Sequence, residues 1–233
     1  MKALALGLAV ASLLMTAAAP AFAADNALTP AEKADGWKLL FDGKSTAGWK
    51  GFKTEAPDAG WTVKDGALGP TPKVSKDLVS KENFENFELD FDWKISPKGN
   101  SGVMFHVIPV GDETYESGPE YQILDNAHGE PPPQQAASLF ALYPPSKDMT
   151  KPVGEFNHGR IVVDHGKVQH WLNGVKVVEY DMNSAEFKAR VAASKFKRWP
   201  QFATGKTGAI ALQMHGEPGD PVWFKNIKIK VLK

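Results

Sequence analysis

Carboxylate and amide side chains alternate with apolar ones in a short segment near the middle of the chain. In residues 119–124, the polar residues Glu120 and Gln122 alternate with the apolar residues Tyr121 and Ile123. Alternate side chains of an extended strand point to opposite faces, so Glu120 and Gln122 are expected to share the face away from the core. A carboxylate can move a proton, and an amide beside it can donate and accept hydrogen bonds. This pair is therefore a candidate for acid–base chemistry on a polar ligand.

Two further segments send polar side chains to the same kind of face. In residues 208–215 the alternation leaves Gln213 and His215 beside two alanines, and in residues 101–107 it turns His106 outward. If these strands share a sheet, one of its faces carries Glu120, Gln122, His106, Gln213 and His215. Such a face suits a sugar, whose hydroxyls need donors and acceptors at fixed positions. The alternative is an ordinary solvated face, but those are richer in Lys, Glu and Thr.

Three carboxylates also line up along one predicted strand. Glu88, Asp90 and Asp92 lie two residues apart, as in the carboxylate row of laminarinase-like glycosidases. Residues i and i+4 of a strand are about 13 Å apart, whereas a retaining glycosidase holds its two carboxyl groups about 5 Å apart. Lys94 continues the row. An ordinary charged outer face is therefore the preferred interpretation.

Several other reaction classes lack their motifs. The sequence contains no P-loop, no Gly-x-Gly-x-x-Gly and no Gly-x-Ser-x-Gly, and without any Cys it has neither disulfides nor a thiolate nucleophile. Its six His residues include no His-Glu-x-x-His. His106, His215 and Glu120 can still converge across strands, so a divalent metal stays open and no cofactor is certain.

The period of the apolar residues is two along most of the chain. In residues 87–95, five apolar residues alternate with four charged ones, which predicts a strand with one buried face. Asn173-Gly174 predicts a tight hairpin, Thr29-Pro30 predicts a helix start, and Ser184–Ala193 predicts a short interior helix. The same pattern predicts further strands at residues 37–41, 101–107, 119–124, 160–164, 167–172, 175–180, 208–214 and 222–231. An all-β antiparallel sandwich or barrel is expected.

The segment 126–157 interrupts this pattern. It contains Pro131-Pro132-Pro133 and Pro144-Pro145 and shows little regular period. Loops of this length in a compact domain usually border a site.

The N-terminus has the layout of a cleavable signal peptide. Lys2 precedes an apolar run over residues 3–15, and Ala21-Phe22-Ala23 offers the small-x-small pattern of a cleavage site. The run is shorter than the roughly 20 residues of a spanning helix, so no membrane anchor is expected. Residues 1–23 are thus predicted to be removed, leaving a mature chain that starts at Ala24 and is periplasmic or secreted.

The composition of the mature chain narrows its partners. Residues 24–233 are within the size that a single β-sandwich domain can reach. The 27 basic and 27 acidic residues of the full sequence balance, and the basic ones are not gathered into a stripe, so nucleic acid is not an expected partner.

The chain resembles the 3-keto-disaccharide hydrolase domain family, formerly a domain of unknown function, over nearly all of the mature chain. The resemblance rests on segments spread along the sequence: residues 37–44 with Gly48-Trp49, 99–103, 118–126, 151–155, 170–174, 193–196, 210–216 and 222–227. It implies a concanavalin-like jelly roll, a two-sheet antiparallel β-sandwich with one or two short helices. It also implies an enzyme that cleaves the glycosidic bond of 3-keto-disaccharides.

The chemistry that the resemblance implies can be assigned to residues. A ketone at C3 acidifies the C2 proton, so a base can start an elimination that expels the C1 substituent, with water adding afterwards. Glu120 or His215 fits the base, and Lys195, His170 or a divalent cation can hold the enolate. Glu120, His215 and Lys195 are the predicted catalytic residues. The predicted substrate-binding residues are Gln122, Asp125, His106, Asn100, His170 and Gln213.

Two positions depart from the family pattern, and one alternative function remains. Met214 stands where the family usually has an acidic residue, which weakens a metal site there. His106 stands where Arg is usual, which replaces a fixed cation by a titratable group.

A small carbohydrate is the expected ligand, and a sugar 3-oxidoreductase is the expected functional partner. The alternative is a non-catalytic carbohydrate-binding module on the same sandwich.

Overall fold

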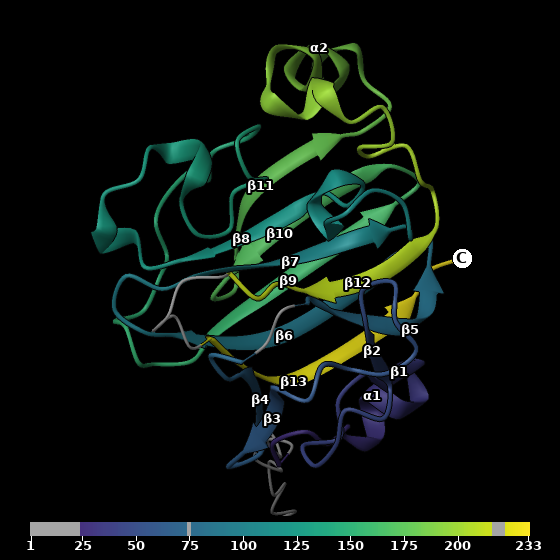
Figure 1. Ribbon diagram of the computed structural model, residues 1–233, viewed down its shortest axis with the longest axis vertical. Coiled ribbons are helices and arrows are strands. Elements are labelled where there is room, and N and C mark those ends of the chain that lie inside the picture. The colour runs from purple at the N-terminus through teal and green to yellow at the C-terminus, as the bar shows by residue number, and fades with distance from the viewer. Residues whose placement is uncertain (1–23, 74–75, 216–221) are drawn as a thin grey trace, which may run out of the picture.

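The computed structural model describes residues 24–73, 76–215 and 222–233, and these form two antiparallel β-sheets packed face to face (Figure 1). The predicted signal peptide, residues 1–23, lies outside the described residues. Sheet A has eight strands in the spatial order β11 (Val175–Asp181), β10 (Lys167–Leu172), β9 (Asn157–Asp164), β6 (Phe87–Ile95), β13 (Val222–Val231), β4 (Ala67–Pro70) and β3 (Trp61–Lys64), with β1 (Trp37–Leu39) also paired to β13. Sheet B has five, in the order β2 (Trp49–Gly51), β5 (Leu78–Phe84), β12 (Gly208–Leu212), β7 (Asn100–Val107) and β8 (Glu120–Leu124).

The core lies between the two sheets and is built from the alternate apolar residues of their strands. Phe91 of β6 and Tyr121 of β8 meet edge to face across it, with ring centroids 5.3 Å apart. Phe91 has this room because Gly159 is opposite it on β9, where a Cβ atom would lie 2.6 Å from the ring. The prediction of a two-sheet antiparallel sandwich is confirmed.

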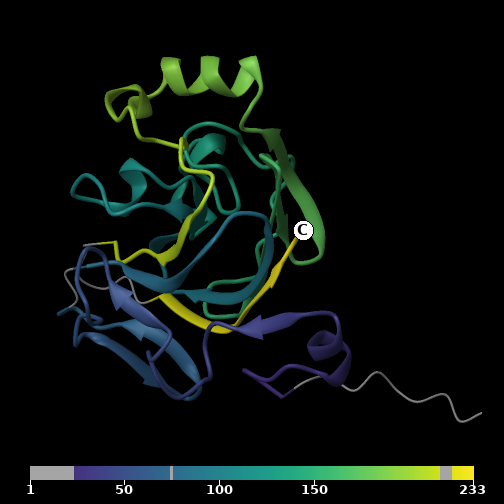
Figure 2. The ribbon, with the colours of Figure 1, turned by 90° about the vertical axis from the view of Figure 1, so that its right-hand side faces the viewer.

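Two α-helices lie at opposite ends of the long axis within the described residues (Figures 1 and 2). α1 (Pro30–Ala34) begins after a Thr29 cap, and α2 (Ala185–Ala193) begins after a Ser184 cap whose hydroxyl accepts from the Phe187 N–H at 3.0 Å. Both caps satisfy helix N–H groups that would otherwise lack acceptors. The predicted helix starts are confirmed. Short 3-10 turns occur at η1 (Thr114–Glu116), η2 (Asn126–His128), η3 (Pro132–Gln134) and η4 (Lys195–Arg198).

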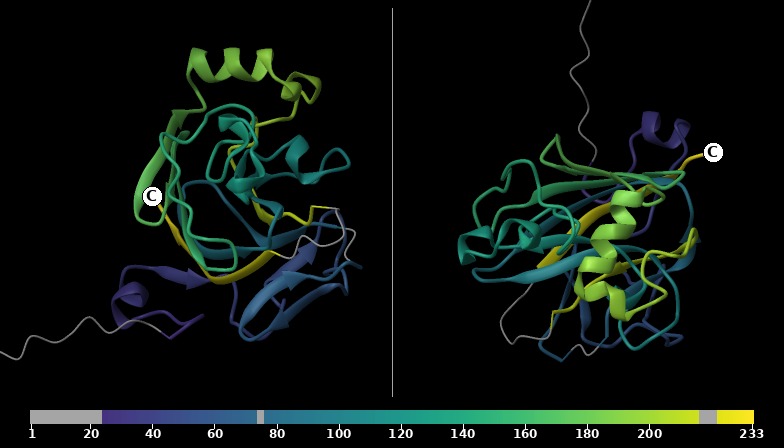
Figure 3. Two further views of the ribbon diagram at one scale, coloured as in Figure 1. Left: turned by 90° about the vertical axis from the view of Figure 1, so that its left-hand side faces the viewer. Right: turned by 90° about the horizontal axis from the view of Figure 1, so that it is seen from above.

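Sheet A curves around the core, with β11 beside α2 and β13 farther along the curve (Figure 3). Sheet B closes the other side, so one of its faces packs on the core and the other faces outward. The Asn173-Gly174 hairpin joins β10 to β11, with φ of 50° and 81° at these two residues. These left-handed angles suit an Asn-Gly turn and confirm that prediction.

Four strands, β2 to β5, were not predicted from the sequence. β5 shows why: Leu78 and Val79 are both buried, and the pairing of β5 with β12 shifts register between Ala209 and Ala211. A bulge of this kind breaks the period of two that the prediction relied on. The omission matters, because Asp77 immediately precedes β5.

The segment 126–157 lies along the free edge of β8. The Gln122 N–H donates to Ser138 O at 3.1 Å, and the Phe140 N–H donates to Glu120 O at 3.1 Å. This loop therefore covers the β8 backbone and brings Phe140 beside the residues described below.

Neither α-helix in the described part of the chain has the length and apolar character needed to cross a bilayer.

Candidate functional site

Glu120 is a buried carboxyl group on the outward face of sheet B. Its side chain is 6% exposed and leans over Gly102 of the neighbouring strand β7, where an added Cβ atom would lie 2.2 Å from Glu120 Oε1. Burial raises the pKa of Glu120 to about 8, the charge of Lys195 lowers it, and the charge of Asp77 raises it further. A carboxyl group in this range can act as a proton acceptor near neutral pH.

The strand register sets the neighbours of this carboxyl group. On β8, Gln122 is directly opposite Gly102. On the other side of Gly102, its carbonyl oxygen accepts from the Gln213 N–H at 2.9 Å, and the next N–H, that of Met214, donates to Asp77 Oδ1 at 2.9 Å. The sheet therefore lines up four residues across its outward face beside Glu120, in the order Asp77, Gln213, Gly102 and Gln122.

Lys195 lies at the start of η4 and is an exposed residue whose ammonium group lies near three aromatic rings. Its Nζ atom is 4.3 Å from the ring centroid of Phe140, 5.3 Å from that of Phe196 and 5.8 Å from that of Tyr115. Partial burial lowers the pKa of Lys195, while the charge of Glu120 raises it and that of Arg198 lowers it. No ion pair holds its Nζ within the described residues. Cation–π contacts position the charge without neutralising it.

Asp77 is a second buried carboxyl group at this site, and sequence reasoning missed it. The Thr114 hydroxyl donates to Asp77 Oδ2, and the Met214 N–H donates to Oδ1. Burial raises the pKa of Asp77 to about 6, while these hydrogen bonds lower it and the nearby charge of Glu113 raises it. The available signal was an acidic residue just before an apolar pair, but recognising it required β5.

Two amides flank Glu120. Gln122 is 2% exposed; in one orientation its amide nitrogen donates to Asn100 Oδ1 at 3.2 Å. In the reverse orientation, which satisfies more groups, the nitrogen donates to Glu120 Oε1 at 3.1 Å and to Ser101 O at 3.0 Å. The structure thus brings the predicted residues Glu120, Gln122 and Asn100 together.

Gln213 is the amide on the other side. Its Oε1 atom is buried and accepts no hydrogen bond from any described residue. A buried acceptor without a donor is costly, and a ligand hydroxyl would satisfy it. His215 lies three residues beyond the end of β12 and is exposed.

His106 does not share the face of Glu120, contrary to the prediction. Its φ of 53° and the register shift of β12 against β7 break the alternation after Met104. The ring packs edge-on against Phe87 and Phe105, and its Nε2 atom is 2.8 Å from Glu85 O. Burial lowers the pKa of His106, which favours the neutral ring at this position.

His170 is also placed away from Glu120, because it points into the core from β10. Its ring centroid is 5.1 Å from that of Tyr121, which occupies the core face of β8 while Glu120 occupies the outward face. The Nδ1 atom is 3.0 Å from Ala137 O. Burial lowers the pKa of His170 to about 4, so it is neutral at pH 7 and carries no charge to offer an enolate.

Asp125 serves a turn at the end of β8. Its two carboxylate oxygens accept from the backbone N–H groups of Lys98 at 2.8 Å and Ala127 at 3.0 Å. Asp125 also lines a cleft of about 420 Å³ whose wall includes Trp93 and Asp148. Glu120, Lys195 and Asp77 do not line this cleft.

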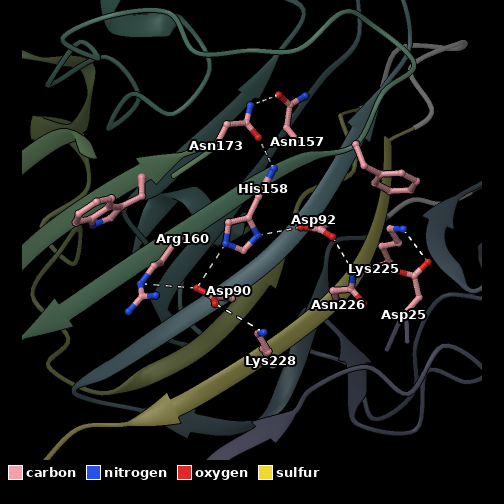
Figure 4. A network of polar contacts seen from close by, with 12 residues as sticks. Asp25, Asp90, Asp92, Asn157, His158, Arg160, Asn173, Lys225, Asn226 and Lys228 are labelled. Carbon is pink, nitrogen blue, oxygen red and sulfur yellow. Dashed lines mark hydrogen bonds and ion pairs between the residues drawn. The ribbon is translucent and has the colours of Figure 1, made fainter. Parts of the chain in front are cut away.

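The carboxylate row of β6 lies on the outward face of sheet A and is held by ion pairs (Figure 4). Asp90 Oδ atoms lie 4.0 Å from His158 Nε2, 3.7 Å from Arg160 Nε and 3.9 Å from Lys228 Nζ. Asp92 accepts from Asn226 Nδ2 at 2.7 Å. These carboxylates pair with basic and amide side chains of neighbouring strands, and Asp90 is buried, at 6% exposure.

No group of three or more His, Cys, Asp or Glu side chains among the described residues is placed to hold a metal ion.

Gly102 is predicted to be indispensable to the placement of Glu120. In Gly102→Ala the new methyl group displaces the Glu120 carboxyl group toward water, so its pKa is expected to fall from about 8 toward the ordinary 4.5. The pKa is read from the Glu120 side-chain carboxyl ¹³C shift, assigned with Glu120→Gln. Gly205→Ala is the matched control, because an added Cβ there has no neighbour closer than 3.4 Å. An unchanged Glu120 titration in a folded Gly102→Ala protein would contradict this placement.

Known proteins resemble this chain in sequence and in overall fold. The chain is 34% identical to the 3-keto-disaccharide hydrolase of Bacteroides thetaiotaomicron, over 85% of this chain and 79% of that protein. A solved structure described as a candidate glycosyl hydrolase from Parabacteroides distasonis superposes with a TM-score of 0.83 at 37% identity, covering 90% of this chain and all of the other. A second one from the same organism gives a TM-score of 0.66 at 27% identity, over 84% and 99% of the two chains.

The carbohydrate-binding module CBM66 from Bacillus subtilis shares the fold alone, with a TM-score of 0.50 at 14% identity over 78% and 95% of the two chains. Residues 36–230 match the family described as the 3-keto-alpha-glucoside-1,2-lyase-like domain. Because that match and the Bacteroides relative each cover most of the chain, this protein belongs to the 3-keto-α-glucoside-1,2-lyase-like family.

Proposed function

We propose that this protein cleaves the glycosidic bond of 3-keto-glycosides, 3-keto-disaccharides among them, by removing the C2 proton. The Bacteroides relative is named for this substrate class, and the family description names a 1,2-lyase. The supporting observation in this chain is the buried Glu120 carboxyl group, on which the charge of Lys195 acts. Enolate formation requires a base and a cation that stabilises the oxyanion.

The proposed reaction has three steps: proton removal at C2, elimination of the C1 substituent, and addition of water. Glu120, as carboxylate, takes the proton from C2, and the electron pair of that bond moves to form an enolate whose negative charge rests on the C3 oxygen. Lys195 stabilises this oxygen through its ammonium charge. The enolate then re-forms the ketone as the C1–O bond breaks, leaving a C1=C2 double bond, and the departing oxygen takes up a proton. Addition of water across C1=C2 gives the 3-keto sugar, so the net result is hydrolysis.

The amides beside Glu120 suit the rest of the sugar. Gln213 Oε1 needs a donor, and Gln122 and Asn100 offer donors and acceptors within the same row of residues. Sugar hydroxyls supply both kinds of partner. His215 remains a candidate base from the sequence, while its exposure favours Glu120 for that role.

A substrate comparison tests the function. The purified protein is incubated with a 3-keto-disaccharide and with the unoxidised parent disaccharide, and released monosaccharides are quantified. Cleavage of the keto substrate alone is expected, because only the ketone acidifies the C2 proton. Glu120→Gln, which keeps the side-chain size, is expected to lower kcat by a factor of about 10² or more. Binding of sugar without release from either substrate would indicate a non-catalytic binding module, and cleavage of the parent alone would indicate ordinary hydrolysis.

The proposed roles of Glu120 and Lys195 predict how kcat/KM depends on pH. A base must be ionised, so kcat/KM is expected to fall tenfold per pH unit below the pKa of Glu120, about 8, and to level off above it. The cation must be protonated, so activity is expected to fall again as Lys195 loses its proton, at a pH below the ordinary 10.5. Lys195→Arg keeps the charge and should move the alkaline limb upward. An acid limb near pH 4.5 would contradict the assignment of Glu120 as base.

The protein is proposed to act in the periplasm or outside the cell, after removal of residues 1–23. The ketone at C3 must come from a separate oxidation of the same sugar, so a sugar 3-oxidoreductase is the proposed functional partner. Expression of the full sequence followed by mass measurement of the exported product should give a chain beginning at Ala24. Ala21→Glu, which spoils the small-x-small pattern alone, should retain the N-terminal segment. A full-length mass for the unchanged protein would refute the export proposal.

A further inference from the structure

Asp77 is a buried carboxyl group that the steps above do not use. It is 8% exposed, and both of its oxygens accept hydrogen bonds, one from the Thr114 hydroxyl and one from the Met214 N–H. Thr114 is itself fully buried. Asp77 therefore joins three chain segments that are distant in sequence: the start of β5, the turn η1 and the end of β12.

The segment that Asp77 holds pairs with Gly102, the residue over which Glu120 leans. The Met214 N–H donates to Asp77, and the preceding N–H, that of Gln213, donates to the Gly102 carbonyl oxygen. Asp77 thus fixes the position of Gln213, whose buried Oε1 atom has no partner among the described residues.

We propose that Asp77 is a positioning residue for Glu120. It holds the strand end at Gln213 and Met214 beside Gly102, and its negative charge lies in the same row of residues, on the outward face of sheet B, over which Glu120 leans. The base role of Glu120 rests on the proposed function, but the electrostatic coupling of the two carboxyl groups does not.

Asp77 affects the ionisation of Glu120 through its charge. The charged groups that act on Glu120 are Lys195 from η4, which favours the carboxylate, and Asp77, which disfavours it. Those that act on Asp77 are Glu113, which precedes η1, and Lys76 next to it in the chain. In a dry site two like charges interact more strongly than in water, so removing one eases ionisation of the other.

Replacing Asp77 by Asn separates the effect of its charge from the effect of its hydrogen bonds. In Asp77→Asn the amide oxygen can still accept from the Met214 N–H, and the amide nitrogen can donate to the Thr114 oxygen. The hydrogen-bond pattern is kept while the negative charge is lost. A purely structural role therefore predicts no change in the Glu120 titration, whereas a positioning and electrostatic role predicts a shift to lower pH.

The test follows the ¹³C shift of the Glu120 carboxyl group against pH in the mature protein, residues 24–233, without substrate. In Asp77→Asn the midpoint is expected to move down by about 0.3 pH unit or more. The acid limb of the kcat/KM profile should move the same way, with a lower plateau because the base is weaker. Asp90→Asn is the matched control: it replaces another buried Asp, on the outward face of sheet A, and should change neither quantity.

A second variant covers the case in which Asp77→Asn does not fold. Thr114→Val is nearly isosteric and removes one donor from Asp77, so Asp77 protonates more readily and Glu120 should titrate at a lower pH, by less than in Asp77→Asn. An unchanged Glu120 titration in a folded variant overturns the proposal. Failure of the protein to cleave any 3-keto-glycoside would instead overturn the proposed function, because the titration is measured without substrate.

Discussion

The burial of the Glu120 carboxyl group against Gly102 is the constraint around which this face of sheet B is organised. A side chain at residue 102 would occupy the space of that carboxyl group, and the antiparallel register sets Gln122 opposite the glycine. Burying an ionisable carboxyl group is unfavourable unless its surroundings compensate. Here the compensation comes from an amide on β8, from the charge of Lys195, and from protonation of the carboxyl group itself over much of the physiological pH range.

The rest of the sandwich holds these groups in place. β5, β12, β7 and β8 set the row from Asp77 to Gln122 through backbone pairing, which is stiff and buried on its core side. Lys195 comes from outside the sheet, where the turns η1 and η4 and the loop along β8 supply the aromatic rings near its ammonium group. On the opposite sheet, the outward carboxylates are paired with basic side chains of adjacent strands, and Asp90 is buried among them.

Much of the fold and part of the site could be predicted from the alternation of apolar and polar residues along the strands. Glu120 and Gln122 were assigned to one face, and Asn100 joins them through the pairing of β7 with β8. The same rule failed for His106, because a left-handed residue and a bulge reverse the side-chain direction after Met104. It also had no means of placing His170, since a polar residue on a buried face has the same spacing as one on an exposed face. Asp77 was missed because β5 carries two buried residues in succession.

The sequence by itself determined most of the antiparallel strands, the helix caps, the Asn-Gly hairpin and the family to which the chain belongs, because these depend on local spacing and on motifs spread along the chain. Only the tertiary structure decided which groups share the site. Asp77, Gly102, Glu120, Lys195 and Gln213 lie far apart in the sequence, and their proximity depends on strand order and register. Those in turn result from how two sheets bury their apolar faces together, a property that no single segment contains.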